Sequence, residues 1–313
     1  MRGLLGRFWV RAAKPGAAGS RGKCLGPDCT PVRRIWRRAQ WWNPRIGLHG
    51  QPSCVPQCFE HAARLRLARL CAPAPPELPV QHRIPLGLLM LARGQISHRQ
   101  LEQALAAQRK NGAGRIGEWL ETLGFATESQ IISALAVQWA CPVFASSSIL
   151  DLGAARMLPH RLLAVFRMCP VQFVERSRTM YVSFTDRVNY SALYAIEQML
   201  ECRTEPGLVA GRVMDQFLEQ AAGQRGPGDL LFESPHDPAD MARITCGYVL
   251  RFGAEDVRIV RFGSYIWARL QVGADAANLL FGLSAGASGF RDILPPVVFP
   301  SWVAAKVHPA ASR

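Results

Sequence analysis

Four of the nine cysteines form two close pairs near the start of the 313-residue chain. Cys24 and Cys29 make the first pair, Cys54 and Cys58 make the second, and 24 residues separate them. Four thiolates can surround one zinc ion tetrahedrally, and a short segment with few aliphatic residues gains stability from such a link. The spacing therefore favours a structural zinc site. Free thiols are the alternative, because the spacing within the first pair is wider than the commonest one.

The second cysteine pair leads directly into FEHAARLRLARL, which we expect to be a helix with its last metal ligand on its first turn. This ending resembles a treble-clef zinc knuckle, with Val55 where the knuckle has serine. Between the pairs, RRIWRRAQWW interleaves arginines with tryptophans. Such a mixture can clamp single-stranded nucleic acid or dock on an anionic membrane, whereas a solvated basic segment is the plainer alternative.

Most of the formal charge of +14 lies in the first part of the chain. Residues 1 to 70 contain 14 Lys and Arg against two acidic residues, so this part carries +12. A basic arm attracts any polyanion, and its charge alone does not choose between an anionic membrane, nucleic acid and an acidic partner. With 49% hydrophobic and 19% charged residues, the remainder has the composition of folded domains.

No arrangement of catalytic residues emerges from the sequence. The metalloprotease pattern H-E-x-x-H is missing. A phosphate-cradling loop needs G-x-x-x-x-G-K-[ST], but the only Gly-Lys pair is followed by Cys24 and has Ala17 at the position of the first glycine. We therefore expect no enzyme activity and no ATP hydrolysis.

The sequence also predicts the surroundings of the protein. No apolar run is long enough for a membrane-spanning helix. Arg7 and Arg11 interrupt the first apolar stretch, which argues against a secretory signal. We therefore expect a cytoplasmic protein, possible contact with the inner membrane through the basic arm, and reduced cysteines.

The clearest pattern in the chain is an internal repeat. Residues 85–108 align with residues 115–138 at a constant offset of 30, without a gap. A repeat of this kind indicates one structural unit packed on its own copy. The matched pairs include Leu86 and Ile116, Gly87 and Gly117, Met90 and Leu120, Gly94 and Gly124, Leu101 and Ile131, and Gln108 and Gln138.

Each copy is predicted to be two short amphipathic helices, because its apolar residues recur at helical spacing. Gly94 and Gly124 stand where the first helix of each copy must end in a left-handed conformation. Ser97 with Gln100 then forms a capping box at the start of the second helix, and the second copy repeats it from Thr127. These devices fix the helix boundaries.

The pattern LGxxLxxxGxIxxxxLxxALxxQ, twice in tandem, resembles the N-terminal domain of the GspE/PilB-type ATPases of type II secretion and type IV pili. This domain is called MshEN where it binds cyclic di-GMP. The resemblance extends over residues 84 to 222, through a Leu-Pro, a strand pair and a helix. Farther on, YVLRFGAEDVRIVRFGSYIWARLQVG resembles the opening of the next ATPase domain, with matches at Gly253, Ala254 and Asp256. Because the phosphate-cradling loop is not found, we expect this chain to act without the ATPase motor.

The resemblance implies a cyclic di-GMP site in which an arginine before Leu-Gly approaches a guanine, while glycines and apolar residues give close, dry contact. The first copy has Pro85 in place of this arginine, and losing a charged hydrogen bond costs about 1.5 to 3 kcal/mol. Arg83 could substitute. The alternative is that these positions only pack two helical hairpins. The implied ligand-binding residues are Gly87, Met90, Gly94, Gln108, Arg115, Gly117, Leu120, Gly124 and Gln138.

The resemblance further implies a non-catalytic adaptor that docks on a platform or assembly protein of a secretion or pilus system. The rival prediction is a zinc-stapled, basic nucleic-acid-binding protein that uses residues 24 to 70. A third hypothesis is that the chain is a degenerate ATPase fragment with no independent role.

The predicted fold class is α+β, with a tandem helical-hairpin repeat, a small α/β subdomain, an N-terminal zinc-knuckle-like segment and a C-terminal helix with a hairpin. The predicted divisions are a basic arm (1–22), a cysteine-paired segment (23–72), a linker (73–80), a GspE N-terminal-like domain (81–222), a second linker (223–238), the helix and hairpin (239–272) and an irregular tail (273–313).

Overall fold

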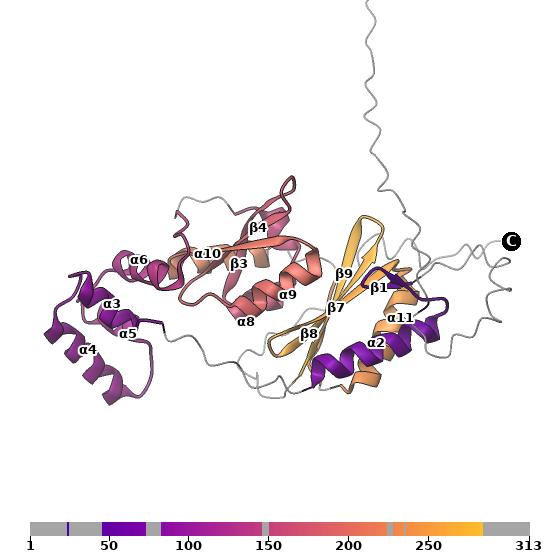
Figure 1. Ribbon diagram of the computed structural model, residues 1–313, viewed down its shortest axis with the longest axis horizontal. Coiled ribbons are helices and arrows are strands. Elements are labelled where there is room, and N and C mark those ends of the chain that lie inside the picture. The colour runs from indigo at the N-terminus through magenta and orange to yellow at the C-terminus, as the bar shows by residue number, and fades with distance from the viewer. Residues whose placement is uncertain are drawn as a thin grey trace, which may run out of the picture.

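The described part of the chain folds into three units that lie in a row along the longest axis (Figure 1). They are the tandem repeat, a central α/β unit, and a sheet with two helices on one face, so the predicted α+β class is confirmed. No helix within these residues has the length and apolar character to span a membrane. The computed structural model describes residues 24, 46–72, 83–145, 150–223, 228–234 and 236–283.

The repeat forms the four short helices that the sequence predicts. The first copy gives α3 (Leu86–Ala92) and α4 (His98–Asn111), and the second gives α5 (Ile116–Thr122) and α6 (Glu128–Trp139). Both predicted capping boxes are present at the starts of α4 and α6. The residues after the first helices, Gly94 and Gly124, have φ of +67° and +69°, which confirms the predicted left-handed ends.

The two copies pack so that each contributes one helix to a pair with the other copy. Helix α3 packs against α6, and α5 packs against α4, so the first helix of each copy contacts the second helix of the other. Met90 and Leu120, which are equivalent in the repeat, are fully buried between the helices. Neither copy can bury its apolar face alone, which explains why the unit is a pair.

The central unit continues the core of the repeat. Its sheet has the order β3-β4-β5, with β3 and β4 antiparallel and β4 and β5 parallel. Its buried residues belong to the same hydrophobic cluster as those of the repeat. The elements are α7 (Leu152–Arg156), α8 (His160–Phe166), β3 (Met168–Val174), β4 (Thr179–Phe184), α9 (Tyr190–Leu200), β5 (Arg203–Leu208) and α10 (Gly211–Ala222).

The third unit is a six-stranded sheet of order β2-β1-β7-β8-β9-β6. Helices α2 and α11 pack against each other and cover one face of this sheet, while α9 of the central unit contacts β7. The elements are β1 (Gly47–Leu48), β2 (Gln51–Pro52), α2 (Pro56–Cys71), β6 (Asp229–Phe232), α11 (Pro238–Phe252), β7 (Asp256–Phe262), β8 (Tyr265–Val272) and β9 (Asp275–Gly282).

This sheet corrects three of the predicted divisions. Part of the segment 23–72 joins the sheet, because β1 pairs in parallel with β7 and α2 packs on α11. The linker 223–238 contains β6, and the tail 273–313 contains β9. Strands of two or four residues are too short to show a period, and β9 is buried on both faces, so it has no alternation of apolar and polar residues. The predicted helix and hairpin at 239–272 are present.

Side-chain hydrogen bonds fasten residues 46–72 to β7 at both ends. The backbone N–H of Ile259 donates to Nε2 of His49 over 3.0 Å. Burial lowers the pKa of His49, which favours the neutral ring that can accept this bond. At the other end, Arg261 donates to the carbonyl oxygens of Leu70 (3.2 Å) and Ala72 (3.1 Å) at the end of α2, where the last carbonyl groups have no partner within the helix.

Candidate functional site

Two glutamines at equivalent positions of the repeat join its copies. Nε2 of Gln138 donates to the carbonyl oxygen of Ile84 over 2.7 Å, and Nε2 of Gln108 donates to that of Gly114 over 2.9 Å. The donors are 30 residues apart and so are the acceptors. Each bond therefore ties the end of one copy to the start of the other, and the copies are related by an approximate two-fold exchange.

The two predicted glycines, Gly87 and Gly117, each lie close to a side chain on the second helix of their own copy. A Cβ atom on Gly87 would stand 2.5 Å from a methyl carbon of Leu101, and one on Gly117 would stand 3.2 Å from a methyl carbon of Ile131. Leu101 and Ile131 are themselves equivalent in the repeat. Both glycines are buried, so in this conformation they serve close packing rather than contact with a ligand.

The other predicted contact residues divide into buried and exposed ones. Met90 and Leu120 are 0% exposed, so they shape the surface from beneath and offer no contact to a ligand in this conformation. Gly94 and Gly124 are exposed at the helix ends. Arg115 is the charged member of the nine predicted residues, and 61% of its side chain is exposed.

Arg115 lies at the start of α5 and forms an ion pair across the junction with the central unit. Its guanidinium lies 2.5 Å from a carboxylate oxygen of Asp186, which is 48% exposed. The backbone N–H of Arg115 donates to Glu118 over 3.0 Å. No pattern in the sequence identified Asp186 as this partner. An exposed pair of this kind contributes about 0 to 1 kcal/mol, and a ligand can replace it at small cost.

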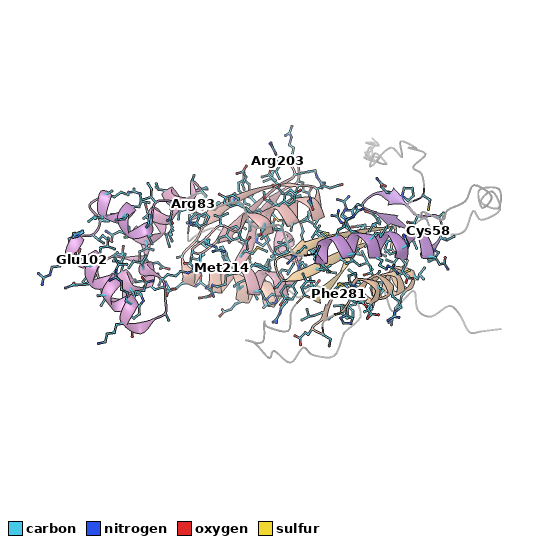
Figure 2. The ribbon with its side chains drawn as sticks, turned by 60° about the horizontal axis from the view of Figure 1, so that its bottom comes forward. Cys58, Arg83, Glu102, Arg203, Met214 and Phe281 are labelled. Carbon is cyan, nitrogen blue, oxygen red and sulfur yellow. The ribbon has the colours of Figure 1, made fainter. Side chains whose placement is uncertain are left out.

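A second cationic group stands near the Pro85 position of the first copy. The guanidinium carbon of Arg83 lies 3.6 Å from the ring centre of Trp139 and 5.7 Å from that of Tyr190. Nη1 of Arg83 is buried and has no hydrogen-bond partner among the described residues. Figure 2 places Arg83 at the junction between the repeat and the central unit. The two aromatic residues carried no signal in the sequence, since neither belongs to the repeat motif.

One loop brings the two cationic groups together. Asp186, the partner of Arg115, and Tyr190, which lies beside Arg83, are four residues apart. Because a chain extends by at most about 3.6 Å per residue, their Cα atoms lie within about 14 Å of each other. Two guanidinium groups and two aromatic rings therefore border one junction, an arrangement suited to a ligand with flat bases and negative charge.

Three of the four predicted zinc ligands also come together, at the opposite end of the molecule. Cys24, Cys54 and Cys58 form one cluster of thiols. Burial, followed by hydrogen bonds with Cys54 and Cys24, raises the pKa of the Cys58 thiol to about 12. The fourth predicted ligand, Cys29, and the basic RRIWRRAQWW segment lie outside the described residues, so binding of nucleic acid or an anionic membrane by that segment stays a prediction.

Comparisons with known proteins found similar solved structures, whereas no protein-family model and no curated protein matches this chain. The structure of MshE with cdg is 28% identical to this chain. The match covers 44% of this chain and 99% of the MshE chain, with a TM-score of 0.39. Two crystal forms of the N-terminal domain of XpsE are 18% and 20% identical, each covers 45% of this chain and 98% of its own, and their TM-scores are 0.35 and 0.27.

Proposed function

We propose that residues 83–222 are a non-catalytic regulatory module of a secretion or pilus system, which binds cyclic di-GMP and docks on an assembly protein in the cytoplasm. The observation that carries this proposal is the convergence of Arg115 and Arg83 on the loop from Asp186 to Tyr190. The tandem motif of the sequence supplies the identity of the ligand. The exchanged packing of the copies supplies a rigid base for it.

The chemistry of the junction matches the parts of a cyclic dinucleotide. Arg115 can turn from Asp186 to a guanine, whose acceptor edge takes two donors from one guanidinium. Arg83 keeps one donor nitrogen without a partner among the described residues, and a phosphate or guanine oxygen would satisfy it. A hydrogen bond to a charged group is worth about 1.5 to 3 kcal/mol, so Arg83 can offset the loss that Pro85 causes.

Exposed apolar side chains on the repeat support the docking of a protein partner. Ile84, Leu88 and Val137 are 61%, 52% and 56% exposed. Ile84 directly precedes α3 and Leu88 lies on it, while Val137 lies on α6, the helix against which α3 packs. Clustered apolar groups at a surface favour burial against another protein.

Calorimetric titration of the intact chain with cyclic di-GMP tests the ligand. We expect one ligand per chain, and we expect Arg115→Ala to weaken binding about tenfold to a hundredfold through loss of a charged hydrogen bond. Arg109→Ala is the matched control, because it removes another exposed charge, from the last turn of α4, and should leave the affinity unchanged. Cyclic di-AMP should bind weakly, since adenine lacks the second acceptor of guanine. An absence of binding heat at high ligand concentration would remove the proposal.

A further inference from the structure

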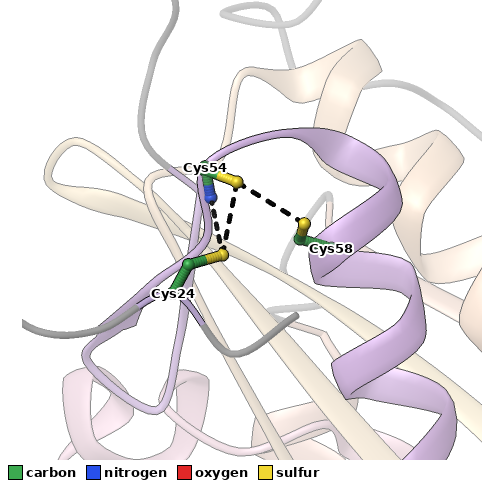
Figure 3. A group of neighbouring side chains, drawn as sticks. All are labelled: Cys24, Cys54 and Cys58. Atoms are coloured by element: carbon green, nitrogen blue, oxygen red, sulfur yellow. Dashed lines mark hydrogen bonds between the residues drawn. The ribbon is translucent and has the colours of Figure 1, made fainter. Parts of the chain in front are cut away.

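Three cysteine sulfurs meet at the start of α2, where Figure 3 shows them facing one another. Sγ of Cys24 lies 3.3 Å from that of Cys54, which lies 3.5 Å from that of Cys58. All three sulfurs lie within 4.8 Å of one another. Cys54 comes just before the helix and Cys58 is on its first turn, as the sequence predicts, whereas Cys24 is 30 residues away along the chain from Cys54.

These separations are close to those of sulfurs that share a metal ion. Tetrahedral zinc holds each sulfur at about 2.3 Å, which places neighbouring sulfurs about 3.8 Å apart. The Cys24–Cys54 and Cys54–Cys58 separations of 3.3 Å and 3.5 Å are within about half an ångström of this value, and the third pair lies within 4.8 Å. Ordinary packing explains the cluster poorly, because its three members are only half-buried. Thiols that fill the core of this protein are buried singly, as at Cys169, Cys202 and Cys246.

Backbone groups beside the cluster can stabilise thiolates once a metal is bound. The N–H of Cys54 points to Sγ of Cys24 over 3.4 Å, so a main-chain donor is already directed at a ligand atom. The first turn of α2, a helix of 16 residues, carries Cys58, and the positive end of a helix dipole stabilises a nearby thiolate. The positive charge of a bound divalent cation offsets the repulsion between three neighbouring thiolates.

We propose that Cys24, Cys54 and Cys58 bind one zinc ion, and that this ion fastens the chain around Cys24 to the six-stranded sheet. On binding, each thiol releases its proton to solvent and its sulfur donates an electron pair to the metal. The three thiolates leave one position of a tetrahedron for a further donor. Because α2 packs on α11 and β7, the ion joins a segment far upstream in the sequence to the core of the sheet. This site is independent of the proposed ligand surface.

Metal analysis of the purified, reduced full-length chain tests the proposal. We expect about one zinc per chain, and after exchange for Co²⁺ we expect the thiolate-to-metal absorption bands of a sulfur-rich tetrahedral site. Removal of the metal with a strong chelator should lower the unfolding temperature, because binding energy at a structural site is folding energy. A chain that contains no zinc after purification, and takes up neither zinc nor cobalt when reduced, would overturn the proposal.

Single substitutions locate the metal. Cys54→Ser and Cys58→Ser should each lose most of the zinc, whereas Cys71→Ser, a half-buried thiol at the other end of α2, should keep it. If a variant fails to fold, cobalt titration of the unaltered chain still decides the question. Full zinc content in Cys58→Ser, or an equal loss in Cys71→Ser, would contradict the assignment. Binding of cyclic di-GMP to the zinc-free chain should be unchanged, which separates this test from that of the proposed function.

Discussion

The two copies of the repeat share one scaffold and differ in what they present at its ends. Both form a helical hairpin with a capping box, a left-handed glycine and a glutamine that bonds to the other copy. The second copy places Arg115 at the start of its first helix, where it reaches Asp186 of the central unit. The first copy has Pro85 there, and Arg83 stacks on Trp139 instead.

This difference separates the residues that make the fold from those that make the surface. The buried and left-handed positions are alike in both copies because each copy must pack against the other. The position before the Leu-Gly is exposed and carries no packing duty, so it can be an arginine in one copy and a proline in the other without changing the hairpin. The proposed ligand surface is therefore asymmetric on a nearly symmetric base.

The largest expected effect tests the symmetric part. Met90→Ala and Leu120→Ala should each lower the free energy of unfolding by about 2 to 5 kcal/mol, because both side chains are fully buried and leave a cavity. Chemical denaturation followed by circular dichroism measures the loss. Leu88→Ala is the control, since Leu88 is 52% exposed and should cost under about 0.5 kcal/mol. A large loss in one copy with none in the other would break the equivalence.

A smaller effect comes from the left-handed glycines. Gly94→Ala and Gly124→Ala should each cost about 1 to 2 kcal/mol, because alanine is strained at positive φ although no atom lies within 4 Å of the added methyl group. Gly247→Ala, which is equally uncrowded but lies within α11, should instead stabilise the chain by up to about 1 kcal/mol. The same denaturation experiment applies, and unchanged stability in either repeat variant would show that its turn is not held in this conformation.

The smallest effect tests the asymmetric part. Arg115→Ala should cost at most about 1 kcal/mol, because its ion pair with Asp186 is exposed, and the loss should shrink as salt is added. Arg83→Ala should cost about 0.5 to 2 kcal/mol with little salt dependence, since its guanidinium lies against Trp139 and is partly buried. Thermal unfolding at low and high salt distinguishes the two. A salt-independent loss above 2 kcal/mol for Arg115→Ala would show that it has a packing role.

The repeat was predictable from the sequence because its signals are local. Caps, glycine ends and helical periods lie within each 24-residue copy, and they correctly placed the left-handed ends at Gly94 and Gly124 and the helix starts after Ser97 and Thr127. The sheet was only half predicted, since β1 pairs with a strand more than 200 residues away and β6 is too short to show a period.

The candidate site divides in the same way. The motif identified Arg115, but its partner Asp186 and the rings of Trp139 and Tyr190 come from loops and helix ends that only the folded chain brings together. The motif also assigned Met90 and Leu120 to the ligand, whereas the structure buries both. The sequence pattern of apolar residues at helical spacing is the same whether these residues pack in the core or line a ligand surface.

The central claim is that both copies contribute to one surface at the junction with the central unit. Hydrogen–deuterium exchange of the intact chain, with and without saturating cyclic di-GMP, tests it most directly. We predict that the ligand protects the backbone amides at the start of α3, at the start of α5 and in the loop from Asp186 to Tyr190 together. Protection confined to one copy, or none in any of the three segments, would contradict the claim.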